Sequence, residues 1–269
     1  MQKKLWNRYV WGKQTLKQLS ATFKKCVPVI QKELDRHKLE KYEVIPRPMI
    51  LIADVTFFGR SYGILVFRSQ LFKQNIYWKE VARETPAIYR EARIDLENKG
   101  FIITGIVLDG KRGVREVFRD IPTQMCQFHQ TAILKRYLTS RPKTEAGQEL
   151  RAIGLALTIL NEKDFLILLG DWHAKWKYFL KEKTFATDGK HWSYTHRRMR
   201  SAYRSLKTNA PFLFTYQKYP ELKIPNTTNS LDGFFGKTKK LLRVHNGLTQ
   251  ERRYKIIQEI FRGKILTKV

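Results

Sequence analysis

The stretch IVLDGKRGVREVFRDIPTQMCQFHQ, residues 106–130, decides the fold. It begins with a run of three apolar residues and then places Asp109 next to a glycine. This order is typical of a buried strand that ends in a carboxylate. A basic turn comes next, and beyond it stands a Cys-x-x-His at 126–129. The flanking sequence indicates which kind of site would combine a strand-end acid, a basic turn and a Cys-x-x-His.

A meander of strands precedes this stretch. The apolar run 49–53 leads to Asp54, residues 59–63 predict a turn, and 64–67 is a second apolar run, so an acid lies on the first strand. The further elements that the pattern predicts are a strand at 75–81, a helix at 86–99 closed by Gly100, a strand at 101–108, a short helix at 114–120 and a strand at 123–128 that carries Cys126.

The order of these elements indicates the fold class. Three strands, a helix, a strand and a further short strand are the order of a ribonuclease-H-like α/β fold with a mixed sheet. From 131 to about 217 the pattern is almost wholly helical, and 256–262 predicts one last helix. We therefore expect a ribonuclease-H-like mixed sheet with an all-helical insertion, preceded by a small helical unit.

The opening residues predict that helical unit, separate from the strands beyond it. A helix at 5–10 precedes two helices that break near 24–26, and Thr15 is the expected N-cap of the first of these two. The last two helices resemble a helix-turn-helix, whose third helix would enter a DNA major groove, and the alternative is a hairpin packed on the main domain. The expected organisation is a helix-turn-helix DNA-binding unit at 1–38, a catalytic domain at 48–130 and 224–269, and the helical insertion at 131–223.

Composition narrows the class of partner. The chain has 269 residues, of which 42% are hydrophobic, which suffices for one sizeable core or for one domain plus a small appendage. Its 52 Lys and Arg against 24 Asp and Glu give a net charge of +28, the usual mark of a polyanion binder. A ribosomal, membrane-surface or merely basic protein is the alternative. The cations are spread along an aromatic-rich sequence, which favours a folded domain with a charged groove.

Cysteine content and hydropathy indicate the compartment. Cys26 and Cys126 form no disulfide framework, which fits a reducing environment. No apolar run is long enough for a membrane span, and the first residues lack a signal-peptide core. We expect a soluble cytoplasmic protein with no membrane partner.

The two strand acids suggest a metal site. In the expected sheet the first and fourth strands lie side by side, so Asp54 and Asp109 would point to the same place. Two facing carboxylates repel unless a proton or a metal lies between them. Hard oxygen ligands suit Mg²⁺ or Mn²⁺, and two such ions can activate a water or 3′-hydroxyl and stabilise the leaving oxygen of a phosphodiester.

With these acids in place, the stretch DGKRGVREVFRDIPTQMCQFH resembles the DDE transposases of the Mutator-like group and related bacterial insertion-sequence transposases. The resemblance runs from about residue 48 to 262. It implies that Asp54 and Asp109 are the first two catalytic, metal-binding acids, that the Cys-x-x-His precedes an all-helical insertion, and that the opening helices bind DNA. It also implies a prokaryotic host and a protein associated with the nucleoid.

The resemblance places the third acid after the insertion. The family carries Thr-Thr-Asn-x-x-Glu at the start of a helix, and residues 227–232 match it with Asp232 where Glu is usual. Asp is one methylene shorter, so the backbone must approach the metal more closely. Asn229 is the expected N-cap of this helix, and Glu221 is a weaker candidate for the third acid. The cations beyond it, expected beside bound phosphates or on a solvated helix face, are Lys237, Lys239, Lys240 and Arg243.

The roles of Cys126 and His129 stay open at this level. Zinc would need four ligands, and no second pair stands at ligand spacing, although His191 and His196 could be recruited. The favoured hypothesis makes Cys126 a buried strand residue and His129 a catalytic residue that contacts the scissile phosphate or an acid. Core packing is the alternative for both.

The insertion carries aromatics interleaved with cations, which can stack on unpaired bases. Core packing is the alternative for each tryptophan. The candidates for DNA contact are Trp172, Trp176, Trp192, Arg197, Arg198 and Arg200.

The sequence supports three functional hypotheses. The leading one is a DNA transposase that binds terminal inverted repeats, cuts a strand with two metal ions and transfers the freed 3′-hydroxyl to target DNA, working as a homodimer or larger on double-stranded DNA. The second is a catalytically decayed or domesticated relative that only binds DNA. The third is a structure-specific or ribonuclease-H-type nuclease, against which the long helical insertion argues.

Overall fold

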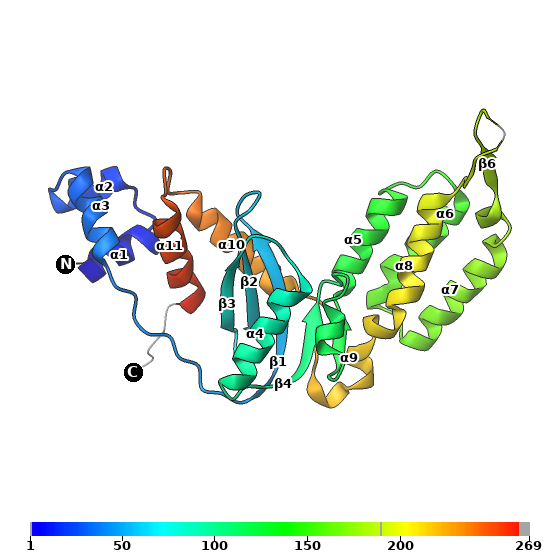
Figure 1. The fold of residues 1–269 in the computed structure, drawn as a ribbon, viewed down its shortest axis with the longest axis horizontal. Helices are drawn as coiled ribbons and strands as arrows, with labels where there is room; N and C mark the ends of the chain where they lie inside the picture. The colour runs from blue at the N-terminus through cyan, green and yellow to red at the C-terminus, as the bar shows by residue number, and fades with distance from the viewer. Residues whose placement is uncertain (1, 189, 264–269) are drawn as a thin grey trace.

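The computed structural model describes residues 2–188 and 190–263, and a five-stranded mixed sheet lies at its centre (Figure 1). The spatial order of the strands is β3-β2-β1-β4-β5, with β1 antiparallel to β2 and parallel to β4. This sheet is compatible with the ribonuclease-H-like architecture that the sequence predicts. Its strands are β1 Pro48–Phe57, β2 Gly63–Ser69, β3 Gln74–Val81, β4 Ile102–Leu108 and β5 Thr123–Met125.

The two faces of the sheet are buried against different helices. Side chains alternate along β1, so Leu51 and Ala53 join a core with α4 (Pro86–Asn98). Ile52 faces the other way and joins a core with α10 (Asn229–Leu242) and α11 (Gln250–Arg262). Because both faces are covered, the central strands β1, β2 and β4 are near-continuous apolar runs. Asp54 is an exception, since its side chain lies on the α10 side of this buried surface.

The opening helices share the second core. They are α1 Gln2–Val10, α2 Leu16–Phe23 and α3 Val27–Arg36. Thr15 begins α2 with a capping box, which confirms the predicted N-cap. The apolar faces of all three helices pack with α10 and α11, and Arg252 of α11 binds the Asp35 carboxylate through two hydrogen bonds of 2.7 and 2.6 Å. The N-terminal segment therefore does not stand apart from the rest of the chain (Figure 1).

A second body of helices extends from the other edge of the sheet (Figure 1). Its helices are α5 Gln127–Leu138, α6 Glu145–Leu155, α7 Glu162–Trp176, α8 Arg197–Leu213 and α9 Thr215–Lys218. They surround a third core that includes Leu150, Phe165 and Leu206. The expectation of an almost wholly helical segment is wrong at one place, because β6 Lys183–Phe185 and β7 Trp192–Tyr194 form an antiparallel hairpin between α7 and α8.

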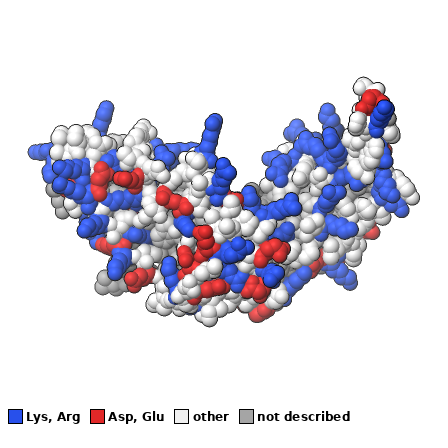
Figure 2. Space-filling model, viewed as in Figure 1, with Lys and Arg blue, Asp and Glu red and all other residues white. Residues whose placement is uncertain are grey.

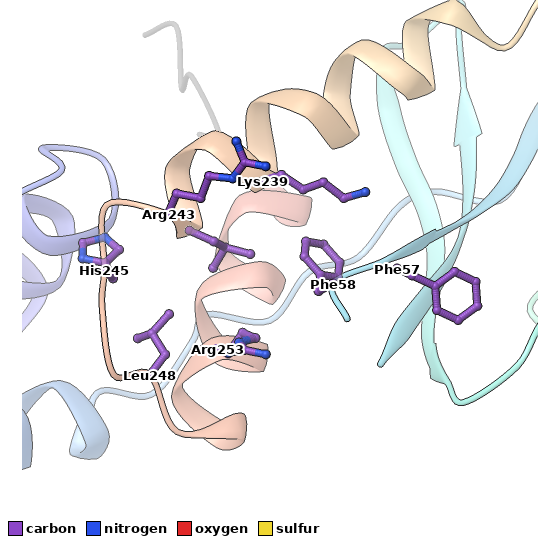
Figure 3. Close-up of a pocket in the computed structure, with 8 residues that line it drawn as sticks. Phe57, Phe58, Lys239, Arg243, His245, Leu248 and Arg253 are labelled. Carbon is purple, nitrogen blue, oxygen red and sulfur yellow. The ribbon is translucent and has the colours of Figure 1, made fainter. Parts of the chain in front are cut away.

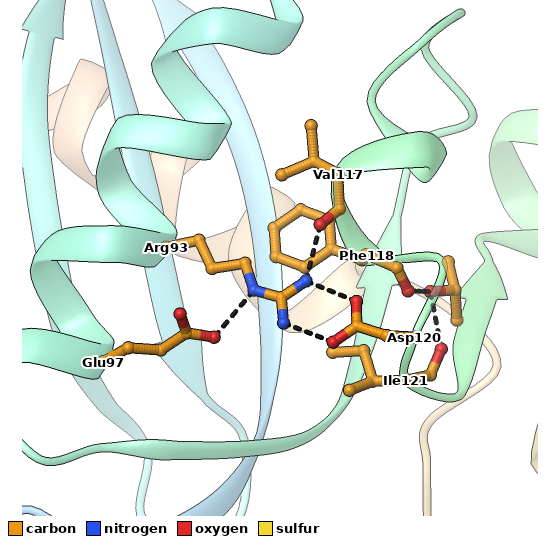
Figure 4. A network of polar contacts seen from close by, with 7 residues as sticks. Arg93, Glu97, Val117, Phe118, Asp120 and Ile121 are labelled. Atoms are coloured by element: carbon orange, nitrogen blue, oxygen red, sulfur yellow. Dashed lines mark hydrogen bonds and ion pairs between the residues drawn. The ribbon is translucent and has the colours of Figure 1, made fainter.

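Arg93 of α4 binds the loop after β4 through hydrogen bonds and an ion pair (Figure 4). Arg93 donates to the Val117 carbonyl over 2.6 Å and to both carboxylate oxygens of Asp120 over 2.6 and 2.5 Å, while its Nε donates to Glu97 over 2.7 Å. The hydrogen bond from Arg93 lowers the pKa of Asp120 to about 2. This clamp holds the segment beyond Asp109 against the rest of the domain.

Most predicted bounds lie within a few residues of those observed, but the last helix, expected at 256–262, begins at Gln250, and the segment around the Cys-x-x-His also differs. The sequence predicts a last strand that reaches 128, but β5 ends at Met125 and Cys126 is the N-cap of α5. The predicted short helix is the 3₁₀ turn Arg115–Phe118. The last six residues of the segment expected at 224–269 lie outside the described residues. Within the described chain, no helix combines the length and hydropathy needed to cross a membrane.

Candidate active site

Two acids stand opposite each other on neighbouring parallel strands. Ile52 of β1 is in register with Val107 of β4, and the same register two residues further sets Asp54 opposite Asp109. Ile52 and Val107 both belong to the core on the α10 side. Since side chains alternate with a period of two, Asp54 and Asp109 also point to that side. The expectation that the first and fourth strands are neighbours is confirmed.

Asp54 is a buried acid, and burial disfavours its ionised form. Only 9% of the residue is exposed, and its carboxylate Oδ1 accepts a hydrogen bond from the Val55 N–H over 2.7 Å. Burial first, and then the charge of Asp109, raises the pKa of Asp54 to about 7. The charge of His129 acts in the opposite direction, and that of Asp232 raises the pKa slightly further. The fold thus brings the other three predicted catalytic residues within electrostatic range of Asp54.

Gly110, the residue after Asp109, allows the tight turn that positions the Asp109 carboxylate. The Lys111 N–H donates to Asp109 Oδ1 over 2.8 Å, which ends the strand in a tight turn. Gly110 has a φ of +93°, and a Cβ there would lie 2.4 Å from the side chain of Met125. The Asp-Gly pair is therefore required by the turn that presents the carboxylate.

Asp232 lies in the first turn of α10, as predicted. The N-cap is Thr228 and not Asn229, which is the first residue of the helix, so that prediction is wrong. The Thr228 side chain is fully buried, and its hydroxyl donates to Asp232 Oδ2 over 3.1 Å. A donor on one carboxylate oxygen fixes the side-chain rotamer and leaves the other oxygen for a ligand.

Buried Cys126 and half-buried His129 form a pair beside this helix start. The Thr228 N–H donates to Cys126 Sγ over 3.3 Å, and the Thr228 hydroxyl lies 3.4 Å from His129 Nδ1. The hydrogen bond with Cys126 raises the pKa of His129 to about 9 against the effect of burial. Burial alone would raise the pKa of the Cys126 thiol, but hydrogen bonds from His129 and Thr228 outweigh it and lower that pKa. The surroundings of His129, including the charges of Asp54 and Asp109, therefore favour its protonated form.

A fifth residue of this site, Glu84, is not predicted by the sequence. It precedes α4 and is half-buried, and its Oε1 accepts a hydrogen bond from the Tyr89 hydroxyl over 2.9 Å. Burial and then the charge of Asp109 raise the pKa of Glu84. Lys111 Nζ lies 3.8 Å from its Oε2. A lone acid in a loop between a strand and a helix carries no sequence signal, so only the fold reveals this neighbour of Asp109.

Whether these residues fit a divalent cation depends on their donors. Asp54 and Asp109 offer hard carboxylate oxygens, which Mg²⁺ and Mn²⁺ prefer, and a cation between them would relieve the repulsion that raises the pKa of Asp54. Among residues 2–188 and 190–263, no three His, Cys, Asp or Glu gather closely enough to form a ligand group. The donors fit a cation held by the Asp54–Asp109 pair, with the remaining positions open to water or phosphate.

The four predicted cations of α10 divide between two sides of the helix. Lys239 and Arg243 line a cavity of about 420 Å³ with Phe57 and Phe58 (Figure 3). Lys237 and Lys240 line a larger cavity of about 890 Å³ on the other side, beside β2 and β3. Spacing along a helix decides this division, since residues three or four apart share a face.

The aromatics of the helical body differ in exposure. Trp172 is only 3% exposed, and its indole N–H donates to the Ala146 carbonyl over 2.9 Å, so the prediction that it stacks on DNA is wrong. Its position faces the core between α6, α7 and α8. Trp176 is half-buried and donates to Glu149 over 2.6 Å. Trp192, on the hairpin, is 47% exposed with Lys183 Nζ 3.7 Å from its ring centroid.

The other candidates lie on the surface. Arg197 and Arg198 are exposed at the start of α8, where Arg198 donates to the Arg136 carbonyl. Glu221, the weaker candidate for the third acid, is exposed in the 3₁₀ turn Pro220–Leu222. The two histidines considered for zinc bind local acids, His191 to Asp188 and His196 to Glu182 over 2.9 Å, and neither contacts Cys126 or His129.

The molecule is hollowed along one side, between the β1–β2 loop and the helices α5 and α8 (Figures 1 and 2). Figure 2 shows Lys and Arg side chains gathered along this concave side, while Asp and Glu concentrate over the lower middle of the view, where α4 lies. Such a separation of charge is what a surface that receives a polyanion requires.

Comparison with known proteins yields matches among solved structures alone. No family model matches the chain, and no curated protein does either. One similar solved structure is a chain of the cryo-EM structure of the simian T-cell lymphotropic virus intasome in complex with PP2A regulatory subunit B56 gamma. The sequence identity is 10%, the match covers 58% of this chain and 69% of that chain, and the TM-score is 0.25. A likeness of this size establishes neither a shared fold nor a shared activity.

Proposed function

We propose that the chain is a metal-dependent DNA transposase of the DDE type. It would bind the terminal inverted repeats of a mobile element, cut a strand and transfer the freed 3′-hydroxyl to target DNA. The observation that carries this proposal is that buried Asp54 faces half-buried Asp109 in a chain with a net charge of +28. Two facing carboxylates repel each other unless a proton or a cation lies between them, so their presence in a basic chain favours metal-assisted phosphodiester chemistry.

Each acid has a defined part in this proposal. Asp54, Asp109 and Asp232 would hold Mg²⁺ or Mn²⁺, which supplies stabilisation of negative charge on the phosphate oxygens when bound. Thr228 keeps the Asp232 carboxylate in one rotamer. The imidazolium of His129 faces the acids and would donate a hydrogen bond to a phosphate oxygen of the scissile strand.

DNA would lie along the concave basic side of the molecule. In this proposal residues 1–38 act as the helix-turn-helix unit, 48–130 and 224–269 form the catalytic domain, and 131–223 form the insertion that holds the strand ends. Arg197, Arg198, Trp176 and the α10 cations would contact the backbone and bases. Two element ends must be held together, so a homodimer or larger assembly on DNA is expected.

A cleavage assay tests this function. The genomic DNA that flanks the gene, which should contain the repeats, is incubated with the protein and Mg²⁺ or Mn²⁺. Cuts at the repeat ends that are lost in both Asp109→Asn and Asp232→Asn establish the transposase and its third acid. Cuts that survive Asp232→Asn but not Asp109→Asn keep the enzyme and move the third ligand elsewhere, with Glu84 tested next.

A DNA-binding protein without catalysis is the second candidate. It is favoured by one observation, namely that no three metal-ligating side chains gather in the described part of the chain. Tight binding of the repeats without cuts by the wild-type protein, together with unchanged binding by Asp54→Asn, would select this candidate.

A further inference from the structure

One cavity beyond the acids is lined by cationic and aromatic side chains (Figure 3). Its volume is about 420 Å³, and it is walled by Lys239 of α10, Arg243 directly after α10, Arg253 of α11, and Phe58 after β1. The apolar side is completed by Leu242, Leu248 and Phe57, and the imidazole of His245 also lines the cavity. Three cations and two phenyl rings, with no acid among the lining residues, form a site for an anion that carries a flat apolar group.

The cations of this cavity are available for a ligand. Lys239 Nζ lies 5.7 Å from the ring centroid of Phe58. Within residues 2–188 and 190–263, neither Lys239 nor Arg243 nor Arg253 is held in an ion pair. Clustered cations without counterions repel each other, and a bound phosphate would relieve that repulsion.

Two elements lead from the acids to this cavity. Along β1, Phe57 and Phe58 come three and four residues after Asp54, which is about 10–13 Å of strand. Along α10, Lys239 comes seven residues after Asp232, which is about 10 Å of helix. The cavity therefore lies about 10 Å from the acid cluster, a distance that corresponds to about three steps along one strand of a DNA duplex.

We propose that this cavity binds a single unstacked nucleotide of the DNA strand that passes the acids. Lys239, Arg243 and Arg253 hold its phosphate, and Phe58 stacks on its base. Aromatic stacking tolerates every base, so the cavity recognises unpaired DNA and not sequence. The proposal rests on the proposed DNA-processing function, and it adds a requirement for local strand opening near the cleavage point.

Binding measured in EDTA tests this inference apart from cleavage. Two fluorescein-labelled probes are compared, a short blunt duplex and the same duplex with an unpaired thymidine overhang. The wild-type protein is expected to prefer the overhang probe. Phe58→Leu, which keeps an apolar side chain, should reduce that preference by about 5- to 150-fold, the range for loss of one base–aromatic stack, while Phe58→Trp should keep it. Thermal unfolding shows whether Phe58→Leu is folded.

Charge is tested with a matched pair on the same helix. Lys239→Gln with Arg243→Gln should lower the salt dependence of overhang binding by a slope of about 0.7, for one lost phosphate contact on a single strand. The control is Lys237→Gln with Lys240→Gln, which removes the same charge from the opposite side of α10. It should weaken binding of both probes alike, through lost backbone contacts, and so leave the ratio of overhang to duplex affinity unchanged. The inference is overturned if wild type shows no preference, if the preference survives both cavity variants, or if the control pair loses it equally. Duplex binding without overhang preference would leave the proposed function standing and remove only the cavity's role.

Discussion

The Thr228 hydroxyl donates a hydrogen bond to Asp232 Oδ2 over 3.1 Å, while the Thr228 N–H donates to Cys126 Sγ over 3.3 Å. The Thr228 hydroxyl has one hydrogen to donate, and a carboxylate is a stronger acceptor than sulfur. The hydroxyl therefore donates to Asp232, while the backbone N–H donates to Cys126. Thr228 therefore links the third acid to the Cys-x-x-His.

Removing that hydroxyl should impair catalysis without unfolding the protein. Thr228→Val keeps the shape and loses the donor, so Asp232 is no longer held in one rotamer. Cleavage at limiting Mn²⁺ is expected to fall about 10- to 100-fold, as is usual when a partner of a metal ligand is lost. Thr228→Ser, which restores the donor, should recover most of the activity. Equal activity of Val and Ser variants would show that the bond has no role.

The metal-free protein should become more stable when the buried acid is removed. The pKa of Asp54 is about 7 in the fold against an ordinary value of 3.8, so the folded chain keeps a proton that the unfolded chain has released. Stability is thereby lost as pH rises from 3.8 through about 7. Asp54→Asn should raise the free energy of unfolding above about pH 8 by at most about 4 kcal/mol, and much less near about pH 4. Urea titrations in EDTA measure the free energy of unfolding at each pH. A gain in stability for Asp54→Asn that is the same at both pH values would contradict this explanation.

Glu84 is expected to matter for activity although no sequence motif selects it. Its carboxylate lies near Asp109, so Glu84→Gln removes a negative charge from the cation's surroundings and should raise the Mg²⁺ concentration needed for half-maximal cleavage. The matched control is Glu91→Gln, an exposed acid on α4 that pairs with Lys79. If both variants cleave alike at every Mg²⁺ concentration, Glu84 is only a partner of Tyr89.

Arg93 should stabilise the loop beyond Asp109. Arg93→Ala removes the bonds to the Val117 carbonyl and Asp120 and the packing of the guanidinium over Phe118, 5.6 Å from its ring centroid. We expect a loss of about 1–3 kcal/mol in the free energy of unfolding, mainly from the unpaired carbonyl and lost packing. Arg90→Ala on the same helix is the control, and an equal loss there would point to helix propensity alone.

Substitutions of buried Trp172 and exposed Trp192 should have different effects on the stability of the protein. Trp172→Phe removes the indole hydrogen bond to the Ala146 carbonyl and leaves a small void in the core, so it should lower stability by about 1–3 kcal/mol and leave DNA affinity unchanged. Trp192→Ala changes an exposed side chain and should have little effect on stability. A loss of DNA affinity in a fully folded Trp172 variant would contradict a purely structural role for that residue.

The strand order can be predicted from the sequence because apolar runs and turn residues alternate clearly between 48 and 108. The facing of Asp54 and Asp109 is a consequence of that order and of the period of a strand. The sequence places the Cys-x-x-His on a strand because apolar residues are frequent between 123 and 128, but the helix α5 begins at Gln127 and carries His129 on its first turn.

Other features depend on tertiary contacts and could not be predicted. Glu84 joins the acids only because α4 packs against β4. The cations of α10 divide between two cavities because α11 and the strands lie on different sides of that helix. Trp172 is buried because α6 and α8 cover its face of α7, which a sequence with Lys and Arg nearby does not reveal.

The most direct test of the central claim is calorimetric titration of the protein with Mn²⁺ at neutral pH, for wild type, Asp54→Asn, Asp109→Asn and the exposed control Asp171→Asn. If Asp54 and Asp109 form one cation site, wild type and the Asp171 variant bind Mn²⁺ and release a proton, and both site variants lose binding. Unchanged binding in Asp54→Asn and Asp109→Asn, or no binding by folded wild type, would contradict the claim that these two acids form a cation site.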